Sequence, residues 1–313
     1  MSHTLALFPG QASQYVGMGK DLSDSSAEVR ELYAFASEQV GEDLAAISFA
    51  GPAERLKRTR FTQPAILTHS LAVWRLIGED GRAQFTAAAG HSLGEYGALV
   101  AAGVIDDRTA IRLVARRAAL MEEASQAQPG TMAALLGMEP DAVEQLCADV
   151  SEADAVVVPA NMNSTGQIAI SGAVSAVEKA VALAKERGAK RALLLEVGGA
   201  FHSPLMESAR AGMAAALAEV TFAAPQLLFI PNVTAEPESD PARIKELLVQ
   251  QITAPVRWAE TMERFSAAGV ATLCEIGPGK VLTGLAKREL AVEKSLSLDT
   301  AEDIEYFLNP TPA

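Results

Sequence analysis

The chain has 313 residues, of which 49% are hydrophobic and 21% charged, and its formal net charge is −13. This is the composition of an ordinary globular protein, which excludes intrinsic disorder, and the length suits one large domain or two modest ones. The acidity argues against a protein that binds nucleic-acid phosphates, although a local basic patch could still bind an acidic protein partner.

The first 128 residues alternate between strand and helix patterns. We expect two strands, Thr4–Phe8 and Phe85–Ala89, and four helices, 27–40, 64–77, Glu95–Ala102 and Asp106–Ala124. Pro64 suits the first turn of the helix 64–77, and Gly103 ends the helix Glu95–Ala102. The order of these elements is typical of an α/β fold.

Residues 131–197 follow the order strand, helix, strand, strand, helix, strand. The segments are Thr131–Leu136, Asp141–Val150, Ala155–Met162, Gln167–Ser171, a helix from the capping box Ser175-x-x-Glu178 to Gly188, and Arg191–Val197. This βαββαβ order is ferredoxin-like, and strand–helix units flank it on both sides. We therefore expect a small ferredoxin-like domain inserted into a larger α/β domain.

The segment Gly90-His91-Ser92-Leu93-Gly94 matches the G-x-S-x-G nucleophile elbow, with an expected strand before it and a helix after it. The glycines allow a sharp turn that would lift Ser92 above the end of the strand, at a helix N-terminus where free N–H groups favour a negative oxygen. We predict that Ser92 is a nucleophile; a structural turn is the alternative.

A serine nucleophile needs a neighbouring base, and the chain has four histidines. His3 precedes the first strand, His69 lies within a helical stretch, and His91 adjoins Ser92, where an elbow points neighbours in different directions. His202 alone follows the elbow, in a loop after a strand, which is the order found in hydrolase-like chains. We predict that His202 is the base; a loop histidine with no catalytic task is the alternative.

The acid that usually orients such a histidine is not evident. Glu196 is close in sequence, but strand alternation gives no reason for it to face His202. A backbone carbonyl can orient an imidazole too, and a helix from Asp240 is expected to end near Gln250-Gln251-Ile252, where carbonyls lack internal partners. A base oriented in this way suits thioester chemistry, which needs less driving force than amide hydrolysis.

Arg117 lies on the apolar face of its helix, three residues after Val114 and four before Met121. Arg112 and Arg116 fall on the polar side instead. A guanidinium that faces the core needs an anionic partner, and a bidentate carboxylate is the natural match. The partner is either an internal Asp or Glu or a substrate carboxylate, and the spacing does not decide between them.

The two cysteines, Cys147 and Cys274, lie far apart in apolar surroundings. We expect buried, reduced thiols; a disulfide is the alternative. Neither Cys-x-x-Cys nor His-Glu-x-x-His spacing occurs, so the sequence predicts no metal site. The chain shows no signal-peptide pattern and no apolar stretch of membrane-spanning length, which predicts a soluble cytoplasmic protein with no membrane contact.

Seven motifs occur in one order along the chain: Phe8-Pro9-Gly10-Gln11, Thr62-Gln63-Pro64-Ala65, Gly90-His91-Ser92-Leu93-Gly94-Glu95, Arg117, Asn161-x-Asn163-Ser164, Ala200-Phe201-His202-Ser203 and Glu275-x-Gly277-Pro278-Gly279. With them, the chain resembles the malonyl-CoA:acyl carrier protein transacylase family over nearly its whole length. The resemblance implies a hydrolase-like parallel-sheet domain of residues 1–128 and 198–313, with an inserted ferredoxin-like domain of residues 129–197.

The resemblance also implies catalytic roles. Ser92 would carry the acyl group and His202 would be the base, which the backbone carbonyl of Gln251 would orient. The backbone N–H groups of Gln11 and Leu93 would form the oxyanion hole. The implied reaction is a ping-pong transfer of malonyl from malonyl-CoA, through malonyl-serine, to the phosphopantetheine thiol of an acyl carrier protein, for fatty acid or polyketide synthesis and without a cofactor.

The resemblance implies a substrate-binding set of Arg117, Gln63, His91 and Asn161, with Arg117 paired to the malonyl carboxylate. The loop Ala200-Phe201-His202 is similar to the malonyl-selecting form of this motif. One departure stands at Ala12, where the family usually has glycine. If that position needs a positive φ, alanine costs on the order of 1 kcal/mol and shifts the neighbouring amide of Gln11.

Two other functions remain open from the sequence. A serine thioesterase or hydrolase could use the same Ser92 and His202, although it would leave Arg117 unexplained and the chain lacks an HGGG-type loop. A non-catalytic acyl-binding module would form no covalent adduct at Ser92. We expect a monomer whose partners are malonyl-CoA and the carrier protein.

An acidic carrier protein needs a local basic surface on this acidic chain. The densest basic cluster is Lys185, Arg187, Lys190 and Arg191, and we expect docking at Lys190 and Arg191 in particular. A second group, Lys280, Lys287 and Arg288, follows Gly279. The alternative is that these side chains complement a helix dipole and solvate the surface.

Overall fold

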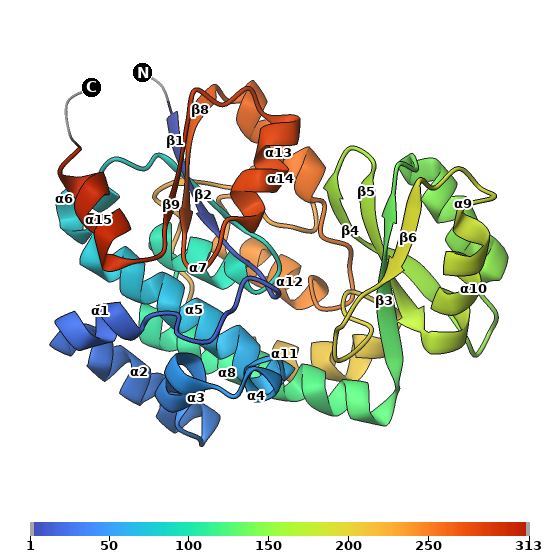
Figure 1. Cartoon of the computed structure of the whole chain (residues 1–313), viewed down its shortest axis with the longest axis horizontal. Coiled ribbons are helices and arrows are strands. Elements are labelled where there is room, and N and C mark those ends of the chain that lie inside the picture. Colours follow the sequence, from blue (N-terminus) through green and yellow to red (C-terminus); the bar gives the residue numbers. More distant parts are fainter. Residues whose placement is uncertain (1–2, 311–313) are drawn as a thin grey trace.

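The computed structural model describes residues 3–310, which form two β-sheets with helices around them (Figure 1). The larger sheet has five parallel strands in the order β7-β2-β1-β8-β9. Their bounds are β1 His3–Phe8, β2 Ala87–Gly90, β7 Leu228–Phe229, β8 Val270–Ile276 and β9 Lys294–Leu298. The α/β fold class expected from the sequence is confirmed.

Helices cover both faces of the parallel sheet. The principal ones are α2 (Ala27–Val40), α5 (Thr59–Leu76), α7 (Gly94–Ala101), α8 (Asp107–Ala127), α13 (Trp258–Ala267) and α14 (Val281–Glu289). Because strand side chains alternate between faces, Ala6 and Phe8 of β1 join the core under α2, α5, α7 and α8, whereas Leu5 and Leu7 join the core under α13 and α14. A strand buried on both faces reads as the continuous apolar run seen at Thr4–Phe8.

The smaller sheet is antiparallel, in the order β4-β5-β3-β6, and lies beside the parallel one (Figure 1). Its elements are β3 Gly130–Leu136, α9 Pro140–Val150, β4 Val157–Ser164, β5 Gln167–Ala173, α10 Val174–Ala184 and β6 Arg191–Leu194. The helices α9 and α10 pack on it around a separate apolar core. The predicted ferredoxin-like order is therefore confirmed, while the exact domain limits at 128/129 and 197/198 stay a prediction.

Shorter elements complete the described chain. They are α1 Lys20–Ser25, α3 Leu44–Ala50, α4 Ala53–Leu56, α6 Gly78–Arg82, a 3₁₀ turn at Pro204–Met206, α11 Glu207–Ala218, α12 Pro241–Gln250 and α15 Ala301–Leu308. Of these, the sequence predicted α12 alone. The side chain of Asp240 caps its first turn by accepting from the N–H of Ala242.

Four predicted boundaries are wrong. Helix α5 begins at Thr59, so Pro64 lies inside the helix rather than in its first turn, because burial of Phe61 extends the helix upstream. The capping box at Ser175 does not form: β5 pairs with β3 through Ala173, and α10 starts directly at the next residue. Helix α10 also ends at Ala184, before the expected Gly188, and β6 ends at Leu194 rather than at Val197.

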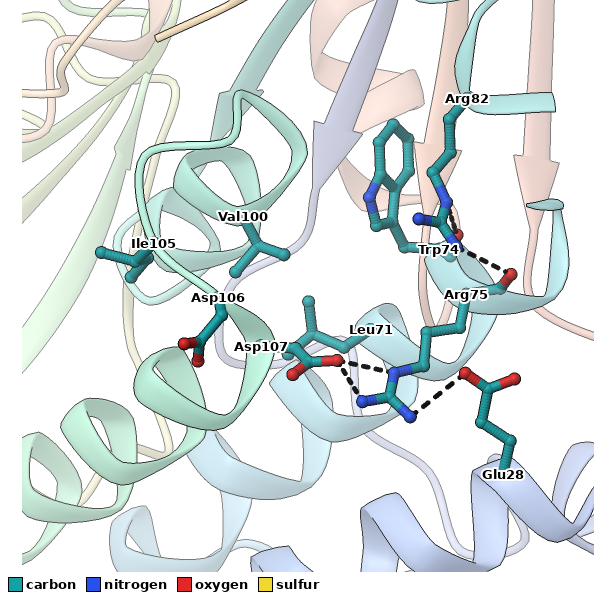
Figure 2. Close-up of a pocket in the computed structure, with 9 residues that line it drawn as sticks. All are labelled: Glu28, Leu71, Trp74, Arg75, Arg82, Val100, Ile105, Asp106 and Asp107. Carbon is teal, nitrogen blue, oxygen red and sulfur yellow. Dashed lines mark hydrogen bonds and ion pairs between the residues drawn. The ribbon is translucent and has the colours of Figure 1, made fainter. Parts of the chain in front are cut away.

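Arg75 fastens together three helices of the large domain (Figure 2). From α5 it donates to Asp107 of α8, with Nε 2.6 Å from Oδ2, and to Glu28 of α2, with Nη1 3.2 Å from Oε1. Arg82 bonds the backbone carbonyl of Trp74 at the end of α5. This junction fixes α5 against α8, the two helices that carry Gln63 and Arg117.

Both cysteines are buried free thiols, as predicted: Cys147 lies in α9 and Cys274 in β8, in the cores of different sheets. Desolvation raises the pKa of the Cys147 thiol to about 12. Among residues 3–310, no helix has the combination of length and apolar character that crossing a bilayer requires.

Candidate active site

Ser92 occupies a tight turn between β2, which ends at Gly90, and α7, which begins at Gly94. Its φ is 52°, a left-handed conformation that costs on the order of 1–3 kcal/mol for a residue with a side chain. The two glycines make the turn possible. A Cβ at Gly90 would stand 1.9 Å from the carbonyl oxygen of Gly94, and one at Gly94 would stand 2.0 Å from that of Phe8. The elbow predicted from the sequence is present.

His202 is hydrogen-bonded to Ser92, with Nε2 2.8 Å from Oγ. Its other ring nitrogen, Nδ1, is 2.8 Å from the backbone carbonyl oxygen of Gln251, so the proton on Nδ1 is donated to that oxygen and Nε2 is the acceptor. Burial, together with the nearby Arg117 charge, lowers the pKa of His202 to about 3. The imidazole is therefore neutral at neutral pH and available to accept the serine proton.

Gln251 directly follows α12, at the helix end where unpaired carbonyls were expected. Glu196 takes no part, since its side chain is 89% exposed and pairs with Lys57. The side-chain amide of Gln251 also contributes, because its Nε2 donates to the backbone carbonyl of Ser92 at 3.0 Å. One residue thus contacts both members of the Ser92–His202 pair.

Arg117 reaches the same point from α8 and has no exposed surface. Its Nη1 donates to Gln63 Oε1 at 2.7 Å, and its Nη2 donates to Ser92 Oγ at 3.0 Å and to Gln251 Oε1 at 3.0 Å. Among residues 3–310, no carboxylate forms an ion pair with it. An internal salt bridge, one of the two partners left open by the sequence, is absent from this part of the chain.

Two backbone N–H groups beside Ser92 are unpaired. In the described chain, neither the Leu93 nor the Gln11 N–H has a protein acceptor, and both residues line the same cavity as Ser92. Free donors of this kind are what a developing oxyanion requires. Ala12, next to Gln11, has φ = 83°, so the position does need a positive φ, as the departure from glycine suggested.

The cavity above Ser92 has a volume of about 260 Å³ and lies between the two sheets. Gln63, His91 and Asn161 line it, as do Met132 and Ala169 of the small sheet. His91 Nε2 is 2.9 Å from Asn163 Oδ1, and burial lowers its pKa, so it too is neutral. The expected site residues, apart from the surface pair Lys190 and Arg191, therefore either line this cavity or, as Arg117 and Gln251 do, bond Ser92 from behind it.

Sequence reasoning missed two residues behind the elbow. Asn232, which follows β7, accepts from the Ser92 N–H at 2.8 Å and donates to the Gly90 carbonyl at 2.8 Å. Glu95, in α7, is 1% exposed and bonds both Asn232 and Gln251. Glu95 belongs to the quoted elbow motif, so its position was visible; no sequence signal marks Asn232.

The described residues contain no group of three or more His, Cys, Asp or Glu side chains placed to hold a metal ion. The groups that meet at Ser92 are a hydroxyl, an imidazole, a guanidinium and backbone donors. Together these groups can form and break an ester on Ser92 while they hold an anionic acyl chain.

The chain is similar to known proteins over most of its length. Residues 6–302 match the family model described as acyl transferase domain. The chain is 45% identical to the malonyl CoA-acyl carrier protein transacylase of Salmonella typhimurium, over 92% of this chain and 93% of that one. It is 44% identical to the enzyme of the same name from Bacillus subtilis, over 98% and 97%.

Two solved structures also resemble this chain over almost their whole length. An acyl carrier protein S-malonyltransferase from Vibrio cholerae superposes with a TM-score of 0.91 at 47% identity, over 97% of this chain and 99% of that one. A malonyl-transacylase in complex with its type II PKS acyl-carrier protein superposes with a TM-score of 0.92 at 41% identity, over 99% and 100%.

The strain at Ala12 yields a stability prediction. Because glycine adopts φ = 83° without a Cβ penalty, Ala12→Gly should raise the free energy of unfolding by about 1 kcal/mol, measured by urea denaturation. The control is Ala83→Gly, at an exposed alanine with φ = −62°, which should lower it. A decrease for Ala12→Gly would show that the loop does not hold this conformation in solution.

Proposed function

The chain belongs to the acyl transferase domain family, and from this premise we propose that it transfers a malonyl group from malonyl-CoA to the phosphopantetheine thiol of an acyl carrier protein. The relatives that it matches over almost their whole length are named for this reaction. One neighbouring structure is a complex of such an enzyme with its carrier protein.

The proposal rests on Arg117, which is buried beside Ser92 and forms no ion pair with a carboxylate of residues 3–310. Its Nη2 is 3.0 Å from the serine Oγ, the atom that would bond the acyl carbonyl carbon. In a malonyl group only one methylene separates that carbonyl from the second carboxylate. An acyl chain so short places its carboxylate within reach of the guanidinium while the carbonyl is at Ser92.

In the first half-reaction, His202 Nε2 takes the proton of Ser92 as its oxygen attacks the thioester carbonyl. The N–H groups of Leu93 and Gln11 stabilise the oxyanion. The imidazolium then protonates the departing coenzyme A sulfur, which leaves malonyl-serine. The Gln251 carbonyl stabilises the imidazolium while it exists, because it accepts the proton on Nδ1.

In the second half-reaction the carrier thiol gives its proton to His202 and attacks the ester, and Ser92 leaves with that proton. The rival reaction is attack by water, which would make the enzyme a thioesterase. The named relatives do not favour it. A backbone carbonyl in place of an acid behind His202 fits a transfer between two thioesters of similar energy.

We also propose that the carrier protein docks near Lys190 and Arg191. Both residues are exposed, and neither forms an ion pair within the described chain, whereas Arg187 of the same cluster pairs with Asp149. The last two residues of β6, Leu193 and Leu194, are apolar and have exposed fractions of 52% and 53%. Unpaired basic side chains beside exposed apolar ones are typical of a surface that binds an acidic partner. This favours docking over the alternative that the basic side chains only solvate the surface.

Two variants test the nucleophile and base. Ser92→Ala should form no malonyl-enzyme, and His202→Ala should slow both half-reactions by at least about 100-fold, since one base serves both thiols. Intact-protein mass spectrometry after addition of malonyl-CoA measures loading, and transfer to carrier protein measures the second step. Full malonylation of Ser92→Ala would exclude this serine, and a slow second step alone would make His202 a carrier contact.

Arg117→Ala should reduce malonyl loading at least about 100-fold while acetyl loading is retained or improved, because only malonyl presents a second carboxylate. Rapid-quench loading rates with malonyl-CoA and acetyl-CoA measure the ratio. Arg116→Ala, at an exposed arginine of the same helix, is the control and should leave both rates unchanged. Equal losses for the two acyl groups would mean that Arg117 is structural.

Charge reversal tests docking. The double variant Lys190→Glu, Arg191→Glu should raise the KM for carrier protein by about fivefold or more at low ionic strength and leave malonyl loading unchanged. The reversal Lys20→Glu, Arg30→Glu on α1 and α2 carries the same charge change as a control. An unchanged carrier KM at low salt would place the docking surface elsewhere.

A further inference from the structure

Glu95 is a buried carboxylate directly behind the catalytic elbow. It is the second residue of α7, three positions after Ser92, and its side chain is 1% exposed. Oε2 accepts from Gln251 Nε2 at 2.8 Å and from the Asn232 N–H at 3.1 Å. Oε1 has no hydrogen-bond partner in the described chain. A carboxylate in such a place is costly unless a cation compensates it.

That cation is Arg117, and the side-chain amide of Gln251 lies between the two charges. Gln251 Nε2 donates to Glu95, and Gln251 Oε1 accepts from Arg117 Nη2 at 3.0 Å. A primary amide has a donor end and an acceptor end, so it can bridge an anion and a cation with both ends correctly paired. The reverse orientation would face oxygen with oxygen and N–H with N–H, so the two charges fix the amide.

The Glu95 side chain also contacts the residues that orient the catalytic pair, although it bonds neither Ser92 nor His202 itself; only the Glu95 backbone N–H donates to the Ser92 carbonyl, at 3.1 Å. Through Asn232 it supports the amide that accepts the Ser92 N–H. Through Gln251 it supports the residue whose backbone carbonyl orients His202. The carboxylate is therefore shared by the supports of the nucleophile, the base and the guanidinium.

From this arrangement, and on the basis of the malonyl transfer proposed above, we propose that Glu95 is a positioning residue and the internal counter-charge of Arg117, acting through Gln251, and that its carboxylate takes up a proton from solvent when the substrate carboxylate binds Arg117. The charge count gives the reason. While Glu95 is ionised, Glu95 and Arg117 together are neutral, and a bound malonyl carboxylate would leave one net negative charge in a buried site. Protonation of Glu95 restores neutrality.

The groups around Glu95 agree with proton uptake there. Burial raises its pKa to about 7, against the opposing effects of Gln251, Asn232 and the Arg117 charge. Among the described residues, Arg117 on α8 is the charged group that acts on it, and Tyr96 on its own helix is neutral because burial raises its pKa. The elements after β7 and α12 present the amides of Asn232 and Gln251. A carboxyl with this pKa gains a proton readily when a second anion approaches.

The sign of the pH dependence follows. Below pH 7 Glu95 is already protonated, and malonyl binding meets no opposing charge. Above pH 7 the ionised carboxylate opposes the incoming one, so the KM of malonyl-CoA for loading should rise with pH, by up to about tenfold per unit, the limit for one proton taken up per carboxylate bound. Acetyl-CoA has no second carboxylate, so its KM should not follow this slope.

The test compares the wild-type chain with Glu95→Gln, which keeps an oxygen to accept from Gln251 and Asn232 but cannot titrate. Single-turnover loading of Ser92 by malonyl-CoA and acetyl-CoA is measured between pH 6 and 9. In the wild type, we expect the KM for malonyl-CoA, but not that for acetyl-CoA, to rise with pH. In Glu95→Gln, we expect the KM for malonyl-CoA to be independent of pH. Glu275→Gln is the matched control: Glu275 is also fully buried, but it accepts from N–H groups of α14, and its loss should leave the slope intact.

A second measurement follows the proton directly. In weakly buffered solution near pH 7.5, an indicator dye should report uptake of up to about one proton per malonyl group loaded by the wild type, and none beyond the thiol background with acetyl-CoA. Uptake by the wild type and not by Glu95→Gln assigns the proton.

The outcomes separate this inference from the function it rests on. If the wild type loads malonyl but shows the same pH slope as Glu95→Gln, or takes up no proton, Glu95 is not the counter-charge. If acetyl-CoA shows the same slope, the titration is unrelated to the substrate carboxylate, and the inference again fails. If the wild type is not loaded by malonyl-CoA at all, the proposed function itself is wrong.

Discussion

Arg117 holds a positive charge at a position with no exposed surface, and its partners are two amides and a hydroxyl rather than a carboxylate. Burying a guanidinium is costly, and the surrounding groups offset part of that cost by accepting from Nη1 and Nη2. Gln63 comes from α5, Gln251 from the end of α12 and Ser92 from the elbow. Three segments far apart in sequence thus converge on one cation. Because all three groups that bond it are neutral, the guanidinium can accept an anionic ligand.

Burial is the main cause of the pKa shifts around the site, and the same charge modifies them. It helps to lower the pKa of His202 and opposes the rise in the pKa of Glu95 that burial causes. His202 is consequently a neutral base held by a carbonyl, with no acid behind it. An acid at that place would bring a second anion into a site that has to accept one from the substrate. The carbonyl of Gln251 orients the imidazole without adding a charge.

The two sheets contribute different parts of the site. The parallel sheet ends in the strained elbow, where Gly90 and Gly94 let α7 approach β1 and β2 closely. The antiparallel sheet contributes the opposite wall of the cavity through Met132, Asn161 and Ala169. The bridge between Asn161 and Val256 ties β4 to the segment that follows Gln251. The small sheet is therefore attached to the same segment that orients the base.

The sequence by itself determined the elements with strong local signals: the βαββαβ order, the glycine-framed elbow at Ser92, the start of the long helix α8 near Asp106, and an arginine on an apolar helix face. Local signals were weaker where burial decided the outcome, as at Pro64, which lies inside α5 because Phe61 is drawn into the core. Only the tertiary structure decided that Arg117 forms no ion pair with a carboxylate of residues 3–310 and that Asn232 and Glu95 stand behind the elbow. Those relations join residues 25 to 156 positions apart, and spacing along a chain carries no record of contacts between elements that pack from different sides.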